Sequence, residues 1–179
     1  MCTLEKRGSI FILTLTSPDA EHRLNPNLID SIKSALSTAK SQATPGSVLI
    51  TTAHGKFFSN GFDLKWAQQP GSPSGFLARV HHMVEHLKPV VADLISLPMP
   101  TIAAVTGHAA AAGMLLAISH DYVVMRGDRG VMYMSELDIG MTFPEYVMAV
   151  LRSKEGCDAG GQEGEGGRGD GDGGGGRGV

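Results

Sequence analysis

Short apolar runs rich in β-branched residues alternate along the chain with stretches of helical spacing. The runs that predict strands cover 10–16, 47–52, 101–105 and 122–125. Apolar residues recur every three or four positions in the stretches 25–39, 76–95 and 113–119. Successive parallel strands need a crossover connection, which is usually a helix. The alternation therefore predicts an α/β fold with mostly parallel strands.

Local signals refine the ends of these elements. Residues 3–6 are a candidate hairpin partner for the first strand, and 131–133 and 144–152 predict a short strand and a further helix. Asn25 followed by Pro26 is typical of a helix start, with the amide as N-cap and the proline in the first turn. Pro89 lies inside the longest helical stretch, which we expect it to kink or split.

The composition changes abruptly near residue 155. Of the 24 glycines, 13 lie in residues 156–179, interleaved with charged residues and almost nothing apolar. Such a segment cannot bury enough surface to offset its ordering entropy, so we predict a folded core over 1–155 and a disordered tail over 156–179. Acids outnumber the bases and there are no aromatics in the tail, which disfavours an RNA-binding arm. A shifted reading frame or a gene-model error is the preferred explanation of the switch.

The bulk composition excludes several classes of function. Hydrophobic residues make up 42% of the 179 residues, and the formal net charge is −3. We therefore expect no basic face for nucleic acid and, because the apolar runs are short, no membrane span. The start of the chain lacks the apolar stretch of a signal peptide. His81, His82 and His86 cluster without ligand spacing around them, so we expect no metal and a solvated helix face.

Two turns and one carboxylate have residues that the packing of a hydrophobic core does not by itself require. The segment 57–64 contains Gly61 and precedes a helix expected to begin at Asp63, while 107–113 joins a strand to a helix through small residues. Both turns can direct backbone N–H groups at one oxyanion, although most strand–glycine–helix turns bind nothing. Glu136 has apolar neighbours, which would raise its pKa and suit a general base. A glutamate in this setting is also typical of a cap or a surface position.

Taken together, three segments resemble the crotonase (enoyl-CoA hydratase/isomerase) superfamily in order and spacing. They are FSNGFDL at 58–64, PTIAAVTGHAAAAG at 100–113, and HDY at 120–122 with SELDIG at 135–140. The match covers about Cys2 to Lys154 and is nearest to the plant peroxisomal Δ3,Δ2-enoyl-CoA isomerases. The resemblance implies a spiral of ββα units. It also implies that relatives continue with a helical region that builds homo-oligomers, which we expect to be absent here.

The resemblance also implies roles for individual residues. The backbone N–H groups of Phe62 and Ala112 would hold the thioester oxygen of an acyl-CoA, and Glu136 would be the acid–base residue. Relatives often have glycine at the position of Ala112, where alanine serves if its φ is negative. The residues implied to line the substrate are Arg23, Ser59, Gly61, Asp63, Leu64 and Gly113. We expect Asp63 to cap a helix as well, and Asp121 and Asp138 to be structural.

The number of carboxylates narrows the reaction that the resemblance implies. Hydratases of the superfamily use a second glutamate, and this chain has Leu115 at that position. One carboxylate suffices to move a proton, so we expect isomerisation of a 3-enoyl-CoA to the trans-2-enoyl-CoA of β-oxidation, without a cofactor. The alternatives are a hydratase, a dienoyl-CoA isomerase and a non-catalytic acyl-CoA-binding remnant. Relatives imply the peroxisome, but the chain ends in Arg-Gly-Val instead of Ser-Lys-Leu, which leaves the cytosol open.

Overall fold

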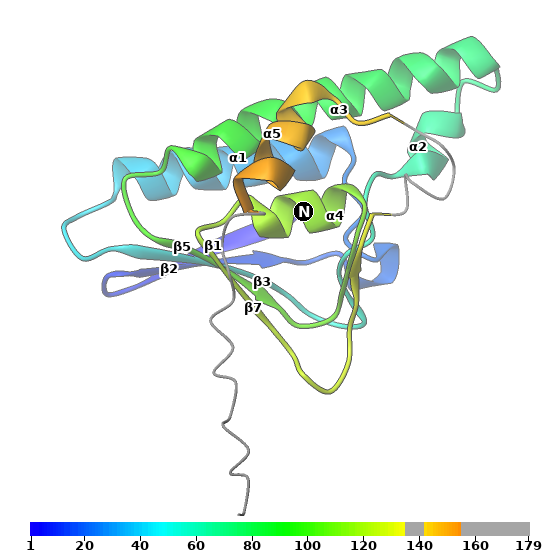
Figure 1. The fold of residues 1–179 in the computed structure, drawn as a ribbon. Coiled ribbons are helices and arrows are strands. Elements are labelled where there is room, and N and C mark those ends of the chain that lie inside the picture. The colour runs from blue at the N-terminus through cyan, green and yellow to red at the C-terminus, as the bar shows by residue number, and fades with distance from the viewer. Residues whose placement is uncertain (135–141, 155–179) are drawn as a thin grey trace, which may run out of the picture.

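The computed structural model describes residues 1–134 and 142–154 (Figure 1). Its strands are β1 (Cys2–Arg7), β2 (Ile10–Leu15), β3 (Val48–Ala53), β4 (Phe57–Ser59), β5 (Thr101–Val105), β6 (His108–Ala110), β7 (Tyr122–Met125) and β8 (Met132–Tyr133). Its helices are the 3-10 turn η1 (Pro18–Ala20), α1 (Pro26–Ser41), α2 (Leu64–Gln68), α3 (Pro73–Ile95), α4 (Ala112–Ile118) and α5 (Glu145–Lys154). The elements expected from the sequence are all present, with ends that differ by a few residues.

The strands form two sheets, one larger and one smaller. The larger sheet has the order β1-β2-β3-β5-β7, and the smaller one has the order β4-β6-β8. Among the strand pairs of the described residues, only the β1–β2 hairpin is antiparallel, while the other pairs are parallel. Each later turn of the chain therefore adds one strand to each sheet and then a helix. This arrangement confirms the predicted α/β fold and its spiral of ββα units.

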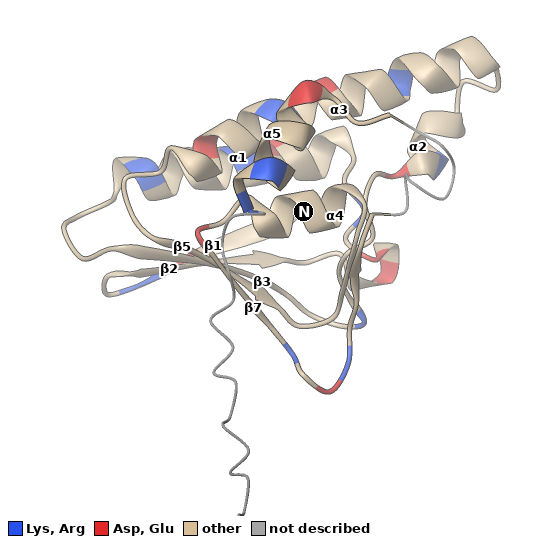
Figure 2. Cartoon of the chain, viewed as in Figure 1, with Lys and Arg blue, Asp and Glu red and all other residues tan. Residues whose placement is uncertain are grey.

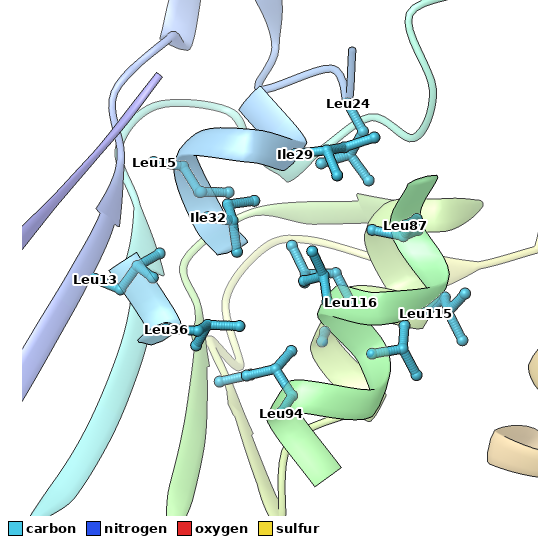
Figure 3. Packing of buried hydrophobic residues seen from close by; sticks show 14 of the residues in the cluster. Leu13, Leu15, Leu24, Ile29, Ile32, Leu36, Leu87, Leu94, Leu115 and Leu116 are labelled. Carbon is cyan, nitrogen blue, oxygen red and sulfur yellow. The ribbon is translucent and has the colours of Figure 1, made fainter. Parts of the chain in front are cut away.

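Helices cover one face of the larger sheet, and the core lies between these two layers (Figure 1). Strands β2, β3 and β5 alternate buried and partly buried residues, which is the period of a half-covered sheet. In Figure 3, apolar side chains from β2, α1, α3 and α4 point toward one another. The labelled members that are at most 2% exposed include Leu13, Ile32, Leu87, Leu94 and Leu116.

Helix α3 is one element of 23 residues that includes Pro89, so of the expected kink or split the split is wrong, and the kink stays a prediction. Proline has no N–H, which leaves the carbonyl of Glu85 without its intrahelical donor. Both Glu85 and Pro89 are exposed, so water can satisfy this carbonyl. Leu87, Val90 and Val91 on the opposite face are buried in the core and hold the helix in place. Packing on one face therefore outweighs the loss of one hydrogen bond on the other.

Acidic and basic residues are interspersed along α1 and α3 in Figure 2, without a face of one sign. The cluster of histidines lies on α3, as predicted, with His81 and His82 exposed. The His86 ring stacks on that of His82 at 5.2 Å, and its Nε2 lies 2.8 Å from Asp30 Oδ1 on α1. Across residues 1–134 and 142–154, the helices are too short or too polar to cross a lipid bilayer.

Candidate active site

The segment 57–64, expected to be a turn, begins with a short strand, because Phe57–Ser59 form β4; the turn itself lies between β4 and the start of α2. Gly61 has a φ of 72°, a left-handed conformation that glycine adopts without steric cost. The next residue, Phe62, forms a parallel bridge with Leu24, and this bridge uses the N–H groups of Leu24 and Asp63. Among the described residues, the N–H of Phe62 therefore has no acceptor. An unpaired backbone donor is rare in a folded protein and is available to a ligand.

The segment 107–113, expected to be a turn, likewise contains a short strand, because His108–Ala110 form β6; the turn itself lies at Ala111, between β6 and the start of α4. Ala111 is the N-cap of this helix, and its methyl group offers no acceptor to the first helical amides. Within the described part of the chain, the N–H of Ala112 also has no acceptor. In the described part of the chain, the residues of positive φ other than glycine are Glu21, His22 and Ala111. The φ of Ala112 is therefore not positive, which is the condition expected for an alanine at this position.

The two turns lie against each other. A Cβ atom added to Gly61 would lie 2.9 Å from Cβ of Ala111 and 3.6 Å from the backbone N of Ala112. A Cβ atom added to Gly113 would lie 2.3 Å from the carbonyl oxygen of Ser59. These contacts leave no room for larger side chains, and they place the amides that follow Gly61 and Ala111 on neighbouring segments. Turns separated by some fifty residues in the sequence thus form one site.

A segment before α1 holds the first turn by backbone hydrogen bonds. The N–H of Leu24 donates to the carbonyl of Gly61 at 2.7 Å, and the N–H of Asp63 donates to the carbonyl of Leu24 at 2.9 Å. The N–H of Asn60 donates to the carbonyl of Glu21 at 3.0 Å. Since these bonds lie on both sides of Phe62, they fix the plane of its peptide group.

His22 connects the same segment to β4. Its Nδ1 lies 3.0 Å from the carbonyl oxygen of Phe57, and its own carbonyl accepts from Oγ of Ser59 at 2.8 Å. Both His22 and Ser59 are fully buried. Burial lowers the pKa of His22, so the ring is neutral at pH 7 and can donate through Nδ1. The hydroxyl of Ser59 therefore already donates its hydrogen bond inside the protein, to the carbonyl oxygen of His22.

Arg23 and Asp63 also have partners inside the protein. The guanidinium of Arg23 donates to Oε2 of Glu21 through Nε at 3.1 Å and Nη2 at 2.5 Å. Hydrogen bonds from Asn60 and Arg23 lower the pKa of Glu21. Asp63 caps α2, as predicted, by accepting from the N–H of Trp66 at 3.1 Å.

The remaining predicted positions differ in their surroundings. Leu64 is 43% exposed beside the first turn, whereas Leu115 is 2% exposed and packs in the core. Asp121 accepts from the N–H and hydroxyl of Thr101 at 2.7 and 2.9 Å, which joins the starts of β5 and β7, as expected of a structural role. Glu136 and Asp138 lie outside the described residues, as does the tail over 156–179.

Sequence reasoning missed three residues that shape the site. Glu21 and His22 adopt left-handed φ values of 54° and 48°, and Ala111 has a φ of 51°. Glutamate and alanine carry no turn signal, because left-handed backbone is usually signalled by glycine or asparagine, and histidine is a weaker signal of it. In residues 1–134 and 142–154, no group of three or more His, Cys, Asp or Glu side chains is placed to hold a metal ion.

Two sheets built from a spiral of ββα units, with the amides of Phe62 and Ala112 free of acceptors among the described residues where adjacent turns meet, define a known class of protein. The family model described as enoyl-CoA hydratase/isomerase matches residues 5–159, and the chain belongs to this family. It is 64% identical over 163 residues to enoyl-CoA delta isomerase 2, peroxisomal, of Arabidopsis thaliana, covering 91% of this chain and 68% of that protein. It is 58% identical to enoyl-CoA delta isomerase 1, peroxisomal, of the same plant, covering 89% of this chain and 64% of the relative.

Solved structures show the same fold at lower identity. An apo enoyl-CoA isomerase from Mtb superposes with a TM-score of 0.73 at 24% identity, covering 84% of this chain and 62% of that one. An enoyl-CoA hydratase/carnithine racemase from Magnetospirillum magneticum gives 0.72 at 21% identity, covering 85% and 55%. The chain thus spans about two thirds of the curated relatives named above. The resemblance to plant isomerases that was read from the sequence motifs is confirmed.

Proposed function

We propose that this chain is an enoyl-CoA isomerase that converts a 3-enoyl-CoA into the trans-2-enoyl-CoA. The observation that carries the proposal is the pair of free amides, on Phe62 and Ala112, at the contact between the two turns. Two N–H donors suit a thioester oxygen that becomes an enolate oxygen during the reaction. The names of the two plant relatives support the reaction type and also the peroxisome as its location.

In the proposed reaction, the carboxylate of Glu136 removes a proton from carbon 2 of the substrate. The electron pair of the broken C2–H bond forms a C1=C2 bond and the carbonyl π electrons move to oxygen, in a dienolate whose oxygen accepts from both amides. The C1=O bond then re-forms, the C1=C2 pair becomes the C2=C3 bond, and the C3=C4 π electrons take up the proton at carbon 4. Glu136 then returns the proton to carbon 4, so the product has a C2=C3 double bond and no atom is gained or lost. The reaction requires no cofactor. Arg23, Leu64 and the backbone around Gly61, Asp63 and Gly113 are proposed to line the acyl-CoA.

Leu115 favours isomerisation over hydration in this proposal. Activation of water would use a second carboxylate, and Leu115 presents a hydrocarbon that is buried among other apolar side chains. A single acid–base group can move a proton between two carbons, whereas addition of water also needs the water to be oriented.

The test is turnover of a 3-enoyl-CoA, followed by the absorbance of the conjugated thioester. Glu136→Gln keeps the size of the side chain and removes the base, so activity should fall by about 10²–10⁴. The matched control is Glu145→Gln, because Glu145 is exposed in the first turn of α5. Activity that survives Glu136→Gln sinks the assignment of the base. Acyl-CoA binding without turnover by the unmodified chain would identify the non-catalytic alternative.

A further inference from the structure

Ala111 adopts a backbone conformation that an alanine rarely takes. Its φ of 51° and ψ of −127° are those of the first central residue of a type II′ turn, a position dominated by glycine. The cause of the cost is the Cβ atom, which approaches the neighbouring carbonyl at positive φ. A residue persists in such a conformation only where its surroundings over-determine it.

Hydrogen bonds on both sides fix the Ala111 backbone. Its N–H donates to the carbonyl of Tyr133 at 2.9 Å, which extends the pairing of β6 with β8. Its carbonyl accepts from the N–H of Leu115 at 3.1 Å, which closes the first turn of α4. The sheet and the helix therefore set its φ and ψ together, and the direction of the next amide, that of Ala112, follows from them.

The methyl group of Ala111 occupies the space beside Gly61. A Cβ atom at Gly61 would lie 2.9 Å from it, closer than two carbon atoms can approach in comfort. The amides of Phe62 and Ala112 thus each follow a residue of positive φ, and these two residues, Gly61 and Ala111, are in contact across the site.

From these contacts we infer that Ala111 is a positioning residue whose strained methyl group sets the spacing between the amides of Phe62 and Ala112. The inference rests on the proposed function, and it deepens it. A glycine at 111 would keep the backbone conformation at no steric cost, but it would let the two turns approach or slide. The alanine at 111 therefore lowers the stability of the fold and maintains the spacing of the two donor amides.

The experiment compares Ala111→Gly with Ala110→Gly, the same change one residue earlier in β6. Ala110 is 1% exposed and has no positive φ, so its replacement should lower Tm through lost packing and added chain entropy. Ala111→Gly should raise Tm by about 2–4 °C and still lower kcat by about tenfold or more at nearly constant KM. Ala111→Ser retains Cβ and should keep kcat within about threefold of the unmodified protein.

A readout without turnover separates this inference from the proposed function. The amide resonance of Phe62 should shift in Ala111→Gly, whether or not the unmodified chain isomerises a 3-enoyl-CoA. An inactive unmodified chain would contradict the proposed function, and Tm and the Phe62 resonance would then decide the role of Ala111. A lower Tm, an unchanged Phe62 resonance, or an unchanged kcat in an active protein would each overturn the inference.

Discussion

Replacement of Gly113 by alanine should destabilise the protein although it improves helix propensity. Gly113 is the second residue of α4, where alanine is normally better than glycine by about 1 kcal/mol. Here the added Cβ would lie 2.3 Å from the carbonyl oxygen of Ser59 and 2.8 Å from its carbonyl carbon. Ser59 is fully buried in β4, so no flexible side chain can move aside.

The structure sets the size of the effect. Ordinary contact requires about 3.5 Å, so α4 and β4 must separate by about 1 Å. Overpacking of this kind costs about 1–3 kcal/mol, which exceeds the gain in helix propensity at most of that range. An overlap of about 1 Å with buried backbone belongs to the upper half of this range, at about 2–3 kcal/mol, so we expect a net loss of about 1–2 kcal/mol in the free energy of unfolding. The same displacement moves Phe62 relative to Ala112, and a misplacement of about 1 Å can lower activity about 10²-fold.

Urea denaturation followed by circular dichroism measures the stability change, and isomerisation of a 3-enoyl-CoA measures the activity change. Gly127→Ala is the matched control, because a Cβ atom there would meet nothing within 4 Å. Its stability should stay within about 0.5 kcal/mol of the unmodified protein. A Gly113→Ala protein as stable as the original would refute the close approach of α4 to β4.

Two further predictions concern the core. Burial lowers the pKa of His120 to about 4, below its ordinary value of about 6.5, so between these pH values the unfolded chain binds a proton that the folded chain does not. The free energy of unfolding should be full above pH 6.5 and fall by about 3 kcal/mol down to pH 4. This pH dependence should be lost in His120→Gln and kept in His81→Gln. Leu116→Ala should lower the free energy of unfolding, measured by urea denaturation, by about 2–5 kcal/mol, since Leu116 is 1% exposed. Leu77→Ala, at 65% exposure, should lower it by less than about 0.5 kcal/mol, and equal losses would contradict the packing of Leu116 in Figure 3.

Much of the fold follows from patterns within short windows of sequence. Asn25 and Pro26 mark the start of α1, and Asn25 accepts from the N–H of Leu28 at 3.0 Å. Asp63 similarly begins α2. These signals work because a helix start needs an acceptor for its first N–H groups, and the side chain that supplies it is adjacent in the chain. The continuity of α3 through Pro89 lies beyond such windows, because buried side chains on its far face decide it.

The candidate site divides in the same way. The sequence by itself determined the two small-residue turns, and it predicted Phe62 and Ala112 as donors through a family resemblance. Only the tertiary structure brought Gly61 against Ala111 and left both following amides without an acceptor among the described residues. Left-handed backbone at Ala111 comes from bonds to β8 and α4, and an alanine gives no local sign of it. Local pattern specifies which segments turn, whereas long-range packing specifies how two turns face each other.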